Sequence, residues 1–112
     1  HFLCSEGIIH IAQPDSAMAA VRDKLDLVTG TGTAAPFALA CLGVMTGLTG
    51  SMLIPLARVS GAMSLAQAWA AAHVDEDFQI RLWGADQEAI DRRARRFVEM
   101  AAADRLWHLV RP

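Results

Sequence analysis

The chain has 112 residues, of which 54% are apolar, and its formal net charge is −2. This length provides for one folded domain with a single core. A weakly negative chain rich in apolar residues is typical neither of a nucleic-acid-binding protein nor of a disordered acidic tail. The two cysteines, Cys4 and Cys41, lie far apart within apolar stretches, without metal-ligand spacing, so we expect buried thiols in a reducing compartment.

Residues 1–14 are predicted to form a short lead-in with strand-like character, because isoleucines are concentrated in residues 7–14. The chain starts at His1 rather than at a methionine, so we expect it to be part of a longer protein. An amphipathic helix is predicted next, over residues 16–28, where apolar residues recur at spacings of three and four.

Residues 27–57 contain no charged side chain, and a stretch of that length is long enough to span a bilayer. Glycines, prolines and threonines interrupt it, however, and divide it into a loop over residues 29–35 and two short helices. The first helix is predicted to begin near Pro36 and the second to cover about residues 50–59. A buried helical hairpin is therefore the favoured interpretation, and a membrane hairpin is the alternative.

A long helix is predicted to start at Ser64, which forms a capping-box pattern with Gln67, and to continue to Trp83 before Gly84. At about 100° per residue, one sector of this helix is apolar except for Glu76. The sector contains Leu65, Trp69, Ala72, Glu76, Ile80 and Trp83.

An ionised carboxylate on an apolar stripe is costly unless it finds a charged partner or hydrogen-bond donors. One explanation for Glu76 is an internal partner, such as Arg58 or an arginine of the last helix, or partial exposure of the stripe. The other explanation is that Glu76 and the flanking tryptophans face a partner protein, where a desolvated charge between aromatic anchors gives specificity.

The three consecutive acidic residues of this helix do not form the pattern of a catalytic or metal site. Neighbouring helical side chains point about 100° apart, so Asp75, Glu76 and Asp77 cannot converge on one ion. His73, Asp77 and Arg81 follow one another at four-residue spacing, which ordinary surface pairing explains. We therefore expect no enzyme activity, no metal and no cofactor.

The last helix is predicted to begin near Asp86, with acidic residues early, where the helix dipole favours them. Its arginine-rich segment, residues 92–96, is interpreted as a solvated face, with a patch for acidic partners as the alternative. The apolar C-terminal segment is expected to dock rather than fray. The elements together predict an all-α, compact helical domain of about five helices with a short strand-like N-terminal lead-in.

Four segments carry a resemblance to a known family. They are VDEDFQIRLWG (residues 74–84), AQAWAAAH (66–73), GIIHIAQP (7–14) and TGSMLIPLA (49–57). Together with the arginine-rich last helix, they resemble the chaperones that assemble the catalytic sector of ATP synthase by binding its alpha subunit, the family of the mitochondrial ATP synthase complex assembly factor 2. Residues 36–43 depart from the family pattern because they lack the charged side chains common there.

The resemblance implies a protein with an N-terminal mainly β domain and a helical C-terminal domain. Residues 1–14 would then be a remnant or linker of the first part, and residues 15–112 the helical domain of a longer α+β protein. It also implies a non-enzymatic chaperone without cofactors, whose partner is the ATP synthase alpha subunit.

Under the same resemblance, the client-binding residues would be found on the predicted long helix. They are Trp69, Asp75, Glu76, Asp77, Gln79 and Trp83. The expected location is the cytoplasm of a bacterium, or the mitochondrial matrix for eukaryotic relatives, without stable membrane insertion or nucleic-acid binding. The alternative function is a helical membrane-associated or oligomerisation domain.

Overall fold

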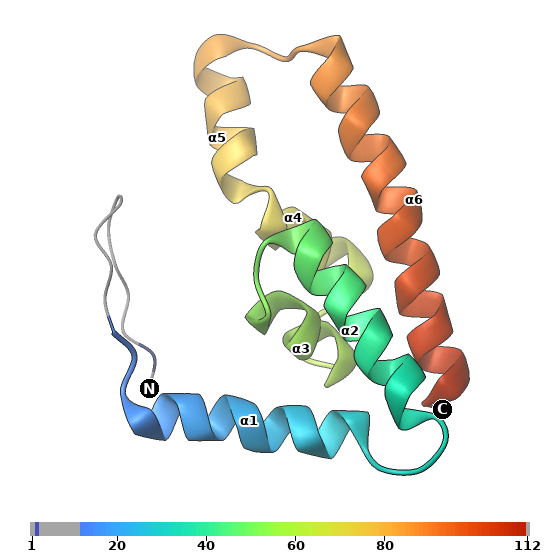
Figure 1. Cartoon of the computed structure of the whole chain (residues 1–112). Coiled ribbons are helices and arrows are strands. Elements are labelled where there is room, and N and C mark those ends of the chain that lie inside the picture. Colours follow the sequence, from blue (N-terminus) through green and yellow to red (C-terminus); the bar gives the residue numbers. More distant parts are fainter. Residues whose placement is uncertain (1, 3–11, 112) are drawn as a thin grey trace.

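A computed structural model of the chain describes residue 2 and residues 12–111. These residues form six helices and no strand. The helices are α1 (Asp15–Thr29), α2 (Ala35–Thr49), α3 (Leu53–Val59), α4 (Leu65–Ala72), α5 (Val74–Trp83) and α6 (Gln87–Val110). Figure 1 shows α2, α3 and α4 gathered beside the C-terminal half of α6, with α1 crossing below them and α5 extending away from them.

The predicted architecture of about five helices with a strand-like lead-in is wrong. The single helix expected over residues 64–83 is two helices, α4 and α5, so the described residues hold six helices and no strand. The isoleucine-rich part of the predicted lead-in, residues 8–11, lies outside the described residues. The division into residues 1–14 and 15–112 therefore stays a prediction.

The break between α4 and α5 is made by His73. Its backbone leaves the helical region, with φ −115° and ψ 18°, and its N–H bonds back to the carbonyl of Ala70 instead of continuing the α-helical ladder. The ring Nδ1 lies 2.7 Å from the carbonyl oxygen of Trp69, the acceptor that the backbone N–H of His73 itself would use in a continuous α-helix. A side chain that takes over a backbone carbonyl competes with the helix, so the chain turns here.

The uncharged stretch of residues 27–57 folds as two short helices with a tight turn, as the glycine and proline pattern predicted. Pro36 lies in the first turn of α2, where its missing N–H has no helical partner to lose. Gly50 ends α2 in the left-handed conformation, with φ 73°, which residues with a side chain rarely adopt. None of the helices in the described residues is long and apolar enough to cross a membrane.

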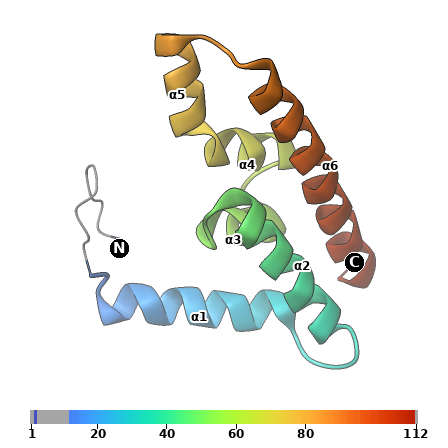
Figure 2. The ribbon, with the colours of Figure 1, turned by 45° about the horizontal axis from the view of Figure 1, so that its top comes forward.

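The core is built mainly between α2 and α6, which lie side by side in both ribbon views (Figures 1 and 2). It consists of two clusters of buried residues: Ala38, Cys41, Leu42 and Trp107 in one, and Met45, Trp69, Met100 and Ala103 in the other. Burial raises the pKa of the Cys41 thiol, which is consistent with the structural thiol predicted from sequence. Cys4 lies outside the described residues.

A bidentate ion pair fastens α3 to α6. Arg58 donates from Nε to Asp104 Oδ1 at 2.7 Å and from Nη2 to Asp104 Oδ2 at 3.1 Å. The Asp104 side chain is only 10% exposed, and its hydrogen bond raises the pKa of Arg58. Arg58 and Asp104 are 46 positions apart in the sequence, and their ion pair fixes the position of α3 along α6.

The C-terminal end of α6 docks onto the end of α1, as expected. Trp107 is buried, and Arg111 donates from Nε to the carbonyl of Val28 at 3.1 Å. Gly30 follows α1 with φ 68°, and a Cβ at this position would overlap the Arg111 guanidinium. The backbone conformation therefore favours glycine here, and any side chain at this position would also push the Arg111 guanidinium aside.

Candidate functional site

Helix α5 projects from the core and has no buried residue. In Figures 1 and 2 it extends away from α2 and α3, and residues 84–86 join it to the start of α6. Four large apolar side chains of α5 are exposed: Val74 at 59%, Phe78 at 53%, Leu82 at 59% and Trp83 at 84%. Exposed apolar side chains on a helix that does not pack against the core usually mark a surface that another molecule covers.

Asp77 and Glu76 face the arginine-rich segment of α6. Arg93 donates from Nη1 to Asp77 Oδ1 at 2.6 Å, and the same nitrogen lies 3.9 Å from Glu76 Oε2. The hydrogen bond from Arg93 holds the pKa of Asp77 below its ordinary value. Glu76 also lies 3.8 Å from His73 Nε2 and keeps 38% of its side chain exposed. The charge of Glu76 is therefore neither fully desolvated nor enclosed between two tryptophans.

Asp75 differs from its two neighbours. It is exposed, and within the described part of the chain its carboxylate has no hydrogen bond or ion pair. It lies in the first turn of α5, where the helix dipole favours a negative charge. Of the three consecutive acidic residues, Asp75 is the one whose charge is fully available to another molecule.

The two tryptophans of the predicted site have different environments. Trp69 lies in the core at 8% exposure, with its ring 4.3 Å from that of His73 and 5.4 Å from that of Phe97. Trp83 lies at the tip of α5 and is almost fully exposed. The break at His73 separates them, so Trp83 belongs to the accessible surface and Trp69 supports the base of α5 from within the core.

Three of the six predicted site residues line one shallow pocket between α5 and the start of α6. Glu76, Gln79 and Trp83 contribute to it, together with Ile80, Gly84, Asp86 and Ala89, and its volume is about 250 Å³. It combines an exposed indole with a carboxamide and a carboxylate, groups that suit an apolar side chain carrying a hydrogen-bonding or basic end. We call this pocket and the free carboxylate of Asp75 the α5 surface.

Arg93 was not singled out from the sequence, although an arginine of the last helix was one of the partners considered for Glu76. The signal was the arginine-rich segment 92–96, but periodicity alone did not show which arginine faces α5. A second pocket between the two helices, of about 230 Å³, is lined by His73, Glu76, Ala89, Arg92, Arg93 and Arg96. In residues 2 and 12–111, no group of histidine, cysteine or carboxylate side chains is arranged to hold a metal ion.

No protein-family model matches the chain, and no curated protein sequence matches it. Solved structures do. A candidate chaperone from Agrobacterium tumefaciens is 41% identical over 96% of this chain, with a TM-score of 0.78. Atp12 from Paracoccus denitrificans is 30% identical over 98% of the chain, with a TM-score of 0.82, and an aspartate-to-lysine variant of the same protein matches equally well in fold.

Over nearly its whole length the chain is similar in sequence and fold to Atp12 and to the Agrobacterium protein. The resemblance inferred from the four sequence segments is thereby confirmed, and it extends over nearly the whole chain. The chain spans 38% of the length of the Agrobacterium protein and 45% of that of Atp12. Its likeness to them concerns less than half of each protein.

Proposed function

We propose that the chain is a chaperone domain that binds the unassembled alpha subunit of ATP synthase during assembly of the catalytic sector. The similarity to Atp12 in sequence and fold supports this, as does the description of the Agrobacterium neighbour as a candidate chaperone. The role is one of binding rather than catalysis. Both neighbours are bacterial proteins, which favours a bacterial setting, and the cytoplasm is the compartment we propose.

The observation that carries the proposal is that α5 contributes nothing to the core. Helix α5 has no buried residue, yet it exposes the indole of Trp83 and the free carboxylate of Asp75. Apolar surface rimmed by charge is what a chaperone needs to cover an interface of a subunit that has not yet met its partner. The α5 surface is therefore the proposed client-binding site.

Within this site the residues have separate roles. Trp83 is the proposed aromatic anchor, because large exposed indoles contribute most when a partner desolvates them. Asp75 and the half-exposed Glu76 attract a basic group of the client, and Gln79 offers a hydrogen bond at the rim. Asp77 holds α5 in place through Arg93, and Trp69 supports the helix from below.

Co-expression with an ATP synthase alpha subunit tests this proposal, with recovery of soluble alpha subunit as the measurement. Trp83→Ala and Asp75→Lys are expected to lower recovery relative to the parent chain. Asp23→Lys is the matched control, because Asp23 is also exposed and lies on α1, away from α5. Equal recovery with the parent, Trp83→Ala and Asp75→Lys would remove the role given to the α5 surface.

A further inference from the structure

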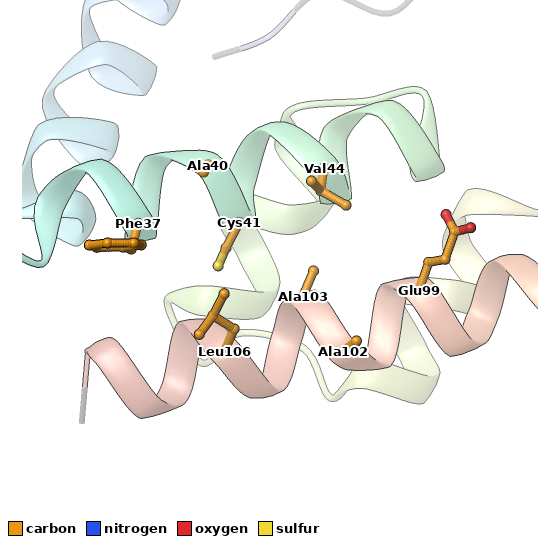
Figure 3. A pocket seen from close by; sticks show the side chains of 8 residues that line it. All are labelled: Phe37, Ala40, Cys41, Val44, Glu99, Ala102, Ala103 and Leu106. Carbon is orange, nitrogen blue, oxygen red and sulfur yellow. The ribbon is translucent and has the colours of Figure 1, made fainter.

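An apolar groove runs between α2 and α6 on a part of the molecule that the α5 surface does not include. Its volume is about 390 Å³, and it is lined by Phe37, Ala40, Cys41, Val44, Glu99, Ala102, Ala103 and Leu106. Figure 3 shows Phe37 near Leu106 at one end and Val44 near Glu99 at the other, so the two helices run in opposite directions along the groove.

The groove exists because its floor is made of small side chains. Each helix contributes four residues at spacings of three, four and seven, and the middle two are small on both sides: Ala40 and Cys41 on α2, Ala102 and Ala103 on α6. Within the floor, Cys41 and Ala103 are buried, whereas the side chain of Phe37 at the end of the groove is 59% exposed. The result is a groove about two helical turns long, which we also call the trough.

The sequence makes this trough unusual for a surface. Helix α2 carries no charged side chain, and an all-apolar helix is normally buried on every side. Here Phe37, Leu39 and Val44 are each about half exposed.

Charge identifies what the trough can bind. Glu99 is the one charged residue of the lining, and within the described residues its carboxylate has no hydrogen bond or ion pair. An apolar trough with one unpaired carboxylate at its end matches an amphipathic helix whose apolar stripe is followed by a lysine or arginine. Spacing supports a helix, since anchors one and two turns apart would fall along a trough of this length.

We propose that the α2–α6 groove binds an amphipathic helical segment of a client protein, with apolar anchors on the alanine floor and a basic residue paired with Glu99. This inference rests on the proposed chaperone function for the identity of the client. The groove would be a second client contact besides the α5 surface. It would recognise a helix by its apolar stripe and terminal charge, whereas the α5 surface uses the aromatic anchor Trp83.

A charge-exchange experiment on the full 112-residue chain tests the groove without the alpha subunit. The probes are two labelled helical peptides that are identical except at one position. Both peptides carry leucines at i, i+4 and i+7. At the position one helical turn after the last leucine, the first peptide has lysine and the second has glutamate. Fluorescence anisotropy is expected to show that the parent chain prefers the lysine peptide by about two- to fivefold and that Glu99→Lys reverses the preference.

Blocking the floor provides the second arm. Ala102→Gln places a polar amide in the trough and is expected to weaken binding of the lysine peptide by about tenfold or more. Ala94→Gln is the matched control, since Ala94 is exposed on the same helix but lies outside the groove, and it should bind like the parent. Circular dichroism of each variant shows whether the helices are retained.

Several results would overturn the inference. One is equal affinity of the parent chain for both peptides; another is unchanged binding by Ala102→Gln. A third is a dimeric parent chain in sedimentation that becomes monomeric in Ala102→Gln, because a second copy would then occupy the groove.

The alpha-subunit assay separates this inference from the proposed function. If the parent raises recovery of the alpha subunit but the peptides show no charge preference, the groove inference fails and the chaperone function stands. If the peptides behave as expected but the parent gives no recovery, the groove binds helices and the client named above is wrong.

Discussion

The guanidinium of Arg93 on α6 lies 2.6 Å from the Asp77 carboxylate on α5, and this contact joins the projecting helix to the long one. In the described residues, the ion pairs between α5 and α6 all involve Arg93. The orientation of α5 therefore depends on one arginine at its base, together with the His73 break and the short connection through Gly84.

Removing that arginine should loosen α5 without unfolding the domain. In Arg93→Ala we expect amide hydrogen exchange in residues 74–83 to become at least several-fold faster, because local opening loses its main restraint. Exchange in the core segments of α2 and α6 should stay close to that of the parent. Arg92→Ala is the control, since Arg92 is exposed and has no ion pair in the described residues; equal acceleration in both variants would contradict the assignment.

The same link should depend on pH. Arg93 lowers the pKa of Asp77 in the native state, so the contribution of the link is complete above the unfolded pKa of about 3.9 and is lost as pH falls through the lowered native pKa. Protection of α5 amides in the parent, compared with Asp77→Asn at each pH, should exceed that of the variant at neutral pH. The difference should close in acid below about pH 4; a difference that persists there would contradict the role of Asp77.

The Arg58–Asp104 pair should matter for global stability. Arg58→Met leaves the nearly buried Asp104 carboxylate without its bidentate partner, and we expect the free energy of unfolding to fall by about 3 kcal/mol. Urea unfolding followed by circular dichroism measures this. The double variant Arg58→Met with Asp104→Leu should recover much of the loss. A single variant as stable as the parent would contradict the stabilising role given to this ion pair.

The capping box at the start of α4 should contribute less to the free energy of unfolding than the Arg58–Asp104 pair. Ser64 Oγ accepts from the N–H of Gln67 at 3.1 Å, and Gln67 Oε1 accepts from the N–H of Ser64 at 2.9 Å. Ser64→Ala should reduce the free energy of unfolding by about 1 kcal/mol. Ser16→Ala on α1 is the comparison, because Ser16 is exposed and its hydroxyl has no hydrogen bond in the described residues, so it should change stability little.

Local signals in the sequence were sufficient where the interaction was local. The Ser64 capping box and the early proline of α2 act within one helical turn, so the residues that make them are adjacent in sequence. The division of the charge-free stretch into two helices followed from its glycines and prolines for the same reason.

Other features were not predictable because they depend on contacts across the fold. Periodicity favoured one continuous helix through His73, whereas the ring of His73 bonds to the Trp69 carbonyl and lies against the buried indole with the two ring planes tilted by 53°. Trp69 and Trp83 occupy one sector of an ideal helix but lie on opposite sides of that break. The client-binding role of α5 stays a prediction, and the co-expression experiment tests it.

The pairing of Arg58 with Asp104 illustrates the same limit. From the sequence, Arg58 was one of the partners considered for Glu76. In the fold, α3 packs against the C-terminal half of α6, and Arg58 Nε lies 2.7 Å from Asp104 Oδ1. Glu76 instead lies near Arg93. Charges of the right sign were visible in the sequence, but their assignment to one another required the tertiary arrangement.

Because α5 has no buried residue, most of its side chains can be replaced without cost to folding. Mutations that change what the helix recognises are thereby separated from mutations that change stability, which fall on the helices that contribute buried residues, α1 to α4 and α6. Such a domain can change the surface that it offers to a partner at little risk to its own fold, provided that Asp77 keeps its link to Arg93.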